Sequence, residues 1–195
     1  MSFKLNSFGF LILISCMLFV PFIFFGGFGV SDDLALITQI GPSYLLDLKY
    51  NLSRSGHISR PVYGFIQTTL LHCFGKEPIY YNSFRFFIWG FLIFMAFRVF
   101  NKMLGKPLTI LFLFFLVFPI FSSSNLVNSM QTGYILSMIF YLAALNTIQD
   151  DNGQFTKKNN RLFFLFSLLA LLSCEIIFPL LLFPIIYQIK NGSNK

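Results

Sequence analysis

Long apolar runs separated by shorter polar stretches are the main feature of the chain. The first run extends from Phe8 to Val30 without a charged residue, which exceeds the ~20 residues that a helix needs to cross a bilayer. Further runs of the same kind follow it. The pattern predicts an all-α fold, a polytopic transmembrane helical bundle of about five spans that forms a single domain over residues 1–195. The expected spans are residues 7–28, 83–100, 108–121, 130–148 and 162–188.

Basic residues in the short loops predict the orientation of this bundle. They lie between the second and third spans and between the fourth and fifth. By the positive-inside rule these two loops and the N-terminus are cytoplasmic. The loops 31–82 and 122–129 and the C-terminus then face the outer side of the membrane. The basic residues that set this orientation are Lys102, Lys106, Lys157, Lys158 and Arg161.

The long first outer loop, residues 31–82, is expected to be partly helical. Two segments in it have helical periodicity, Asp32–Ile40 and Pro61–Phe74. In the second segment apolar residues recur at steps of three and four, and its first residue is a proline, which suits the first turn of a helix. We expect this segment to be an interfacial helix whose apolar face lies on the bilayer or against the spans.

The composition of the chain agrees with a membrane protein. Hydrophobic residues make up 56% of the 195 residues and charged residues only 11%. The core of a soluble domain could not bury so many apolar residues. The net charge of +7 comes from basic residues that are scattered between the apolar runs and never form a block. We therefore expect no nucleic acid partner, and we expect membrane lipids as partners.

Two adjacent carboxylates, Asp32 and Asp33, follow the first apolar run, so the predicted topology places them at a membrane surface. One interpretation is structural: Ser31 is a preferred N-cap residue, and acidic residues in a first helical turn stabilise it by ~0.3–1 kcal/mol. The other is chemical, because paired acids can serve as a general base or hold a divalent metal. Taken alone, the pair fits the structural interpretation better.

The same outer loop carries a second polar group in residues 55–61. Arg60 has a planar, permanently charged guanidinium that is suited to binding a phosphate, and Pro61 begins the expected helix. His57 follows a glycine and lies near Arg60, which makes it the better of the two histidines as a binding candidate. Contact with lipid head groups, or an ion pair with one of the aspartates, is the structural alternative for Arg60.

Glu175 is a polar residue inside the expected fifth span. An ionised carboxylate that faces lipid costs several kcal/mol, so this side chain should point inward, be protonated or find a partner. Intramembrane acids are functional candidates, but we favour a neutral glutamate that hydrogen-bonds a neighbouring helix. The expected partners are Arg85, Arg98 and Ser173.

In these features the chain resembles the polytopic glycosyltransferases of the GT-C superfamily. The likeness rests on an N-terminal span with a paired acid after it, and on a long outer loop in which Arg60-Pro61 leads into a helix. Residues 125–145 and Ser173-Cys174-Glu175 are also similar to patterns in that group. The nearer likeness is to bacterial members that modify O-antigen or other surface glycans. It covers only the front part of a typical member, so the chain is expected to be the N-terminal part of a larger protein, a compact relative or one piece of a split protein.

The resemblance implies a function and a location. A sugar would pass from a polyprenyl-phosphate donor to a glycan or lipid-linked acceptor at the outer face of a bacterial inner membrane. Asp32 or Asp33 would act as catalytic base or help hold a divalent metal, Mg²⁺ or Mn²⁺, and no other cofactor is expected. Arg60 would lie near the donor phosphate, with His57 as a second substrate-binding candidate.

Two other functions stay open. The first is a non-enzymatic membrane subunit, scaffold or flippase-like accessory protein of glycan assembly, in which the acid pair only caps a helix and a partner membrane subunit is implied. The second is a transporter with Glu175 as its coupling residue, which the lack of internal repeats disfavours. The sequence disfavours the reactions of common soluble enzymes, because the chain has no P-loop, GxGxxG or His-Glu-x-x-His motif.

Overall fold

The computed structural model describes residues 9, 41–53, 60–113, 130–149, 160–182, 184 and 186. The regular elements of this part of the chain are helices, which confirms the all-α prediction there. Residues 106–113 are also helical. The named helices are α3 (Tyr44–Ser53), α4 (Pro61–Phe74), α5 (Pro78–Leu104), α7 (Met130–Ile148), α8 (Asn160–Ser173) and the 3₁₀ helix η2 (Glu175–Ile177).

Helix α5 is the longest of these elements. It begins with Pro78 in its first turn and ends at Leu104, and Gly105 follows as the C-cap with a φ of 74°, which favours glycine. Its 27 residues span ~40 Å. Among the described residues, α5 is the helix that is both long and apolar enough to cross a bilayer. It contains the whole of the predicted second span, 83–100.

Two other predicted spans fall on or near described helices. The predicted fourth span, 130–148, has the same limits as α7, a helix of 19 residues. The predicted third span, 108–121, is helical as far as residue 113, and its remainder lies outside the described residues. The first span, 7–28, lies outside them apart from Gly9.

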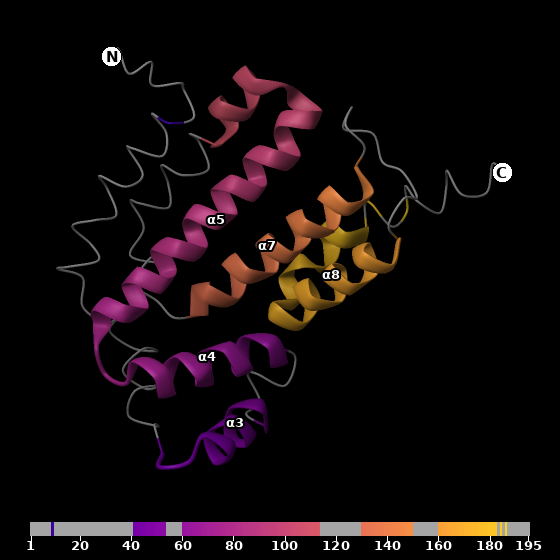
Figure 1. Ribbon diagram of the computed structural model, residues 1–195. Coiled ribbons are helices and arrows are strands. Elements are labelled where there is room, and N and C mark those ends of the chain that lie inside the picture. Colours follow the sequence, from indigo (N-terminus) through magenta and orange to yellow (C-terminus); the bar gives the residue numbers. More distant parts are fainter. Residues whose placement is uncertain are drawn as a thin grey trace, which may run out of the picture.

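Helices α5, α7 and α8 lie side by side and form the bundle (Figure 1). Their shared core is built from residues that recur at helical spacing along α5 and α7, with Phe163 contributed by α8. Helices α5 and α7 run in the same direction, and α8 runs back along α7 (Figure 1). One end of the bundle therefore holds the starts of α5 and α7 and the end of α8. The buried core residues include Ile88, Leu92, Ala96, Val99, Ile135, Ile139 and Leu142.

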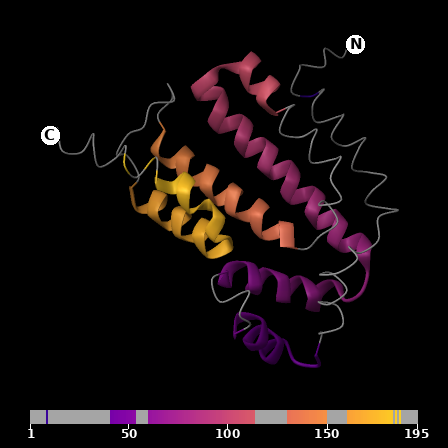
Figure 2. The same cartoon turned by 180° about the vertical axis from the view of Figure 1, so that it is seen from behind.

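The helices of the predicted outer loop lie across this same end of the bundle (Figures 1 and 2). Helix α4 has the limits that its periodicity predicts, which confirms that prediction. Helix α3, which the sequence analysis did not identify, packs against the outer side of α4. The predicted helical segment Asp32–Ile40 lies outside the described residues.

Polar side chains fasten α3 to α4. The buried Asn51 amide donates to the hydroxyl of Thr68 at 2.9 Å. His72 Nε2 lies 2.8 Å from Asp47 Oδ2, which also accepts the backbone N–H of Gly41 at 2.8 Å. Half of the apolar residues of α3 are exposed, so these polar contacts contribute to its attachment to α4.

The predicted fifth span, 162–188, is not one continuous helix, and this corrects the sequence analysis. Helix α8 ends at Ser173, Cys174 is extended with φ −162° and ψ 125°, and helical residues resume at 178–182 after η2. The chain turns back there, so that Leu181 packs in one cluster with Ala170 of α8 and Tyr141 of α7.

Proline explains the position of this break. Pro179 has no backbone N–H and could not bond to the carbonyl of Glu175 in a continuous helix. In the structure it occupies the start of the second helical piece, where its N–H would have no intrahelical acceptor. The prediction of a single span used apolar composition alone, which does not take the missing N–H of Pro179 into account.

The contact between α3 and α4 gives the first prediction. Asn51→Ala removes a buried donor and leaves Thr68 with one partner fewer, so we expect it to lower the free energy of unfolding by about 1–3 kcal/mol. Ser53→Ala removes an exposed hydroxyl from the same helix and should change it by less than about 0.5 kcal/mol. Thermal unfolding in detergent measures both. Equal effects would contradict the role of Asn51.

Candidate functional site

Three parts of the chain meet at the α4 end of the bundle: the start of α4, the first turns of α7 and the break after α8. A glycine makes their close approach possible. A Cβ added to Gly133 of α7 would lie 3.2 Å from the ring of Tyr63 and 3.3 Å from the carbonyl oxygen of Ser173. The fully buried Tyr63 of α4 and the last carbonyl of α8 therefore both pack against the same turn of α7.

Arg60 and Glu175 form a bidentate ion pair across this junction. Arg60 Nε donates to Glu175 Oε2 at 2.6 Å, and Arg60 Nη2 donates to Oε1 at 2.5 Å. Arg60 immediately precedes α4 and is its N-cap residue, while Glu175 is the first residue of η2. The break after α8 thus presents a carboxylate to the start of α4.

The surroundings keep the guanidinium of Arg60 charged. Its hydrogen bonds to Glu175 raise the pKa of Arg60 above its already high usual value, and they outweigh the opposing effect of burial. Arg60 also lies over the ring of Tyr134, with Cζ 5.8 Å from the ring centroid, a cation–π arrangement. The two partners differ in exposure: the side chain of Arg60 is 16% exposed and that of Glu175 is 49% exposed.

Tyr134 also connects Arg60 to an apolar cavity between α5 and α7. The cavity has a volume of about 310 Å³, within the size range of small-molecule sites. Apart from the polar atoms of its tyrosines and tryptophan and the thioether of Met138, the side chains around it are hydrocarbon or aromatic rings, which suits an alkyl or isoprenoid chain. The lining residues are Trp89, Leu92, Ala96, Phe100, Phe112, Tyr134, Ile135, Met138, Tyr141 and Leu142.

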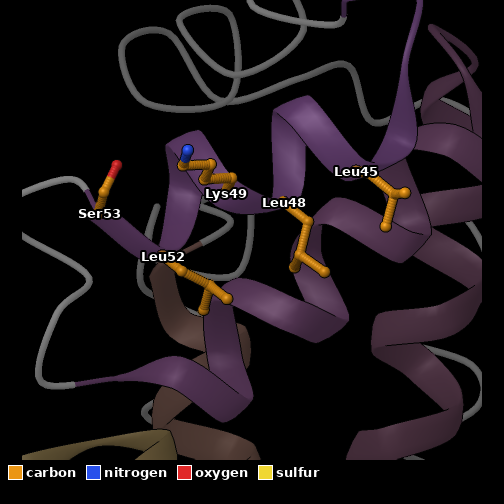
Figure 3. A pocket seen from close by; sticks show the side chains of 5 residues that line it. All are labelled: Leu45, Leu48, Lys49, Leu52 and Ser53. Atoms are coloured by element: carbon orange, nitrogen blue, oxygen red, sulfur yellow. The ribbon is translucent and has the colours of Figure 1, made fainter.

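A second hollow lies on the surface of α3 (Figure 3). It is an open groove along one helix, lined by Leu45, Leu48, Lys49, Leu52 and Ser53. Lys49 is the one charged residue among these five. The groove therefore lacks the paired groups that acid–base or phosphate chemistry needs.

The structure describes some of the predicted site residues and not others. Asp32, Asp33 and His57 lie outside the described residues, so the predicted base and the predicted Mg²⁺ or Mn²⁺ ligands stay predictions. Within the described ranges, no three His, Cys, Asp or Glu side chains gather closely enough to hold a metal. Arg60 and Glu175, which the sequence assigned to separate roles, are brought together.

The expectation for Glu175 needs correction on two points. It does not lie within a continuous span but on a short 3₁₀ turn, with about half of its side chain exposed. Its ion-pair partner is Arg60, which was not among the three partners expected. Of those three, Arg85 lies 3.4 Å from the side-chain oxygen of Asn82 within α5, and the Ser173 hydroxyl donates to the carbonyl of Leu169 within α8.

Sequence reasoning missed Gly133 and Tyr134. Both stand at the start of an apolar run, where one glycine and one tyrosine carry no signal of a site. Their role comes from contacts with residues about 40 and 70 positions away, which periodicity cannot reveal.

Comparison with known proteins finds no matching family model, no matching curated protein and no matching solved structure.

The junction at Gly133 gives the second prediction. Gly133→Val places methyl groups against Tyr63 and the Ser173 carbonyl, so we expect a loss of about 1–3 kcal/mol in the free energy of unfolding. Gly90→Val in α5 is the matched control, because nothing lies within 4 Å of the added Cβ there. Valine favours a helix more than glycine does, so the control should be neutral or slightly stabilising. A loss of stability in the control as large as in Gly133→Val would contradict the close approach.

Proposed function

We propose that the protein is an integral membrane glycosyltransferase, or the N-terminal part of one, that uses a polyprenyl-phosphate sugar as donor. The acceptor is a surface glycan or a lipid-linked precursor of one. The observation that carries this proposal is the position of Arg60, a charged guanidinium beside Tyr134, whose ring lines an apolar cavity. A lipid phosphate has the same two parts, an anionic group and a hydrocarbon chain.

Exposed apolar surface supports a membrane location. Phe87, Phe91 and Phe94 follow one face of α5 at steps of four and three, and Phe87 is 72% exposed. Helix α8 likewise exposes several large apolar side chains. Soluble monomers rarely expose contiguous apolar surface of this kind, whereas lipid would cover it without cost. The exposed residues of α8 are Leu162, Phe164, Leu165 and Leu168.

The positions of the basic residues support an outer location for the site. Lys102 and Arg161 lie at the end of the bundle opposite to α4 (Figure 1). If that end is cytoplasmic, as the positive-inside rule requires, then Arg60 and Glu175 lie at the outer end. Lipid-linked sugars are available as donors on that side.

The proposed reaction is an inverting transfer. The acceptor hydroxyl oxygen attacks the anomeric carbon of the donor sugar, and the bond between this carbon and the phosphate oxygen breaks. Asp32 or Asp33 takes the hydroxyl proton, and Arg60 stabilises the charge on the departing lipid phosphate. A divalent metal held by the same aspartates would supply further charge stabilisation. The predicted topology places these groups in one outer loop.

One observation favours the second candidate, a non-enzymatic membrane subunit of glycan assembly. Arg60 and Glu175 neutralise each other and fasten the break after α8 to the start of α4. A purely structural role would need no more than this. The two functions differ in whether Arg60 must also meet a phosphate.

The proposed orientation gives the third prediction. In a background without the native cysteines, single cysteines at Ser53 and Lys76 should react with a membrane-impermeant thiol reagent in intact cells. Both positions are exposed on the α4 side. A cysteine at Lys106, which is exposed at the opposite end, should react only after the cells are permeabilised. The reverse pattern would place Arg60 in the cytoplasm, where nucleotide sugars would become the expected donors.

The proposed chemistry gives the fourth prediction. The double variant Asp32→Asn, Asp33→Asn should lower glycan transfer by at least about a hundredfold, because asparagine can cap a helix but cannot accept the proton. Protein level and membrane insertion should not change. Glu77→Gln, which removes an exposed acid from the same loop, is the control and should leave transfer normal. Mass spectrometry of the surface glycan measures transfer. Normal transfer in the double variant would leave the membrane subunit as the better candidate.

A further inference from the structure

We propose that Glu175 is a built-in competitor for the anionic group that Arg60 binds, so that a lipid phosphate must displace its carboxylate to enter the site. The inference rests on the proposed function, since it assumes that Arg60 meets a phosphate. In the structure Glu175 itself occupies the hydrogen-bond donors of Arg60, a condition that we call self-occupied.

The geometry of the ion pair is the first support. Glu175 uses Nε and Nη2 of Arg60, two parallel donors of the guanidinium fork. A phosphate group would take the same two donors, because it too presents a pair of oxygens to an arginine fork. A phosphate on this edge of the guanidinium and the carboxylate therefore exclude each other.

The difference in exposure is the second support. The side chain of Glu175 is 49% exposed and stands on a three-residue turn, so its carboxylate can move into water. Arg60 is largely covered, and it keeps its contact with Tyr134. Exchange of the carboxylate for a phosphate would thus move the side chain of Glu175. The guanidinium of Arg60 would stay beside Tyr134, which lines the apolar cavity.

Competition of this kind selects the ligand. A carboxylate on the same chain acts at a high effective concentration, in the millimolar range or above, so dilute chloride or free carboxylates displace it poorly. A phosphate carries more charge, and a hydrocarbon chain in the cavity next to Tyr134 would add binding energy that an inorganic ion lacks. The site would then accept lipid phosphates and exclude common small anions.

The experiment compares binding of one probe to the full chain and its variants in lipid nanodiscs. The probe is dodecyl phosphate, and dodecanol is the uncharged control. Glu175→Gln removes the competing charge while keeping the shape of the side chain, so the Kd for dodecyl phosphate should fall about tenfold if the site is about 90% self-occupied. Glu77→Gln makes the same change in net charge beyond the far end of α4, and its Kd should not change. Inorganic phosphate should bind at least about tenfold more weakly than dodecyl phosphate.

The outcomes separate this inference from the function on which it rests. An unchanged or raised Kd in Glu175→Gln, with tight binding to the unaltered protein, would overturn the competition and leave the phosphate site standing. Equal Kd values for dodecyl phosphate and dodecanol in every variant would overturn the phosphate site itself. Equal affinity for inorganic and dodecyl phosphate would overturn the lipid as the source of the anion.

Further variants guard against a folding defect. Glu175→Asp keeps the charge but shortens the side chain by one methylene, so it cannot keep both hydrogen bonds and should give a smaller gain in affinity. A Kd for Glu175→Asp equal to that of the unaltered protein would count against competition. Arg60→Gln should remove the preference for dodecyl phosphate over dodecanol, and its persistence would overturn the assignment of Arg60.

Discussion

The ion pair between Arg60 and Glu175 joins two parts of the chain that are 115 residues apart. It connects the start of α4, which belongs to the long loop before α5, to the turn that follows α8. Because both hydrogen bonds of the pair are short and parallel, the pair fixes the direction as well as the distance between these elements. Among the described residues, this ion pair links the half-exposed turn to Arg60, the residue that precedes α4.

The break after α8 and the ion pair depend on each other. Pro179 prevents a continuous helix through Glu175, and the resulting turn carries the carboxylate out of the helical register and toward α4. Gly133 lets α7 pack closely against Tyr63 and the last carbonyl of α8. A Cβ on this residue would lie only 3.2–3.3 Å from them. Pro179 and Gly133 thus shape the junction at which the charged groups meet.

The site has the features of a place for an amphipathic anion. Tyr134 presents one face to the guanidinium of Arg60, and it also lines the apolar cavity of about 310 Å³ between α5 and α7. Tyr134 therefore contacts both a charged group and an apolar cavity. The carboxylate of Glu175 balances the charge of Arg60 at this junction.

Sequence patterns determined the local structure of this protein. Periodicity and Pro61 predicted the limits of α4, and apolar length predicted the helices α5 and α7, because these signals act over a few turns of one helix. Helix α3 was not predicted because its sequence mixes apolar and polar residues, and its contacts with α4, such as the hydrogen bond from Asn51 to Thr68, join separate helices. The tertiary structure alone decided that Arg60 meets Glu175 and Tyr134. Such contacts depend on how separate helices pack, and no local pattern records the distance between residues on different helices.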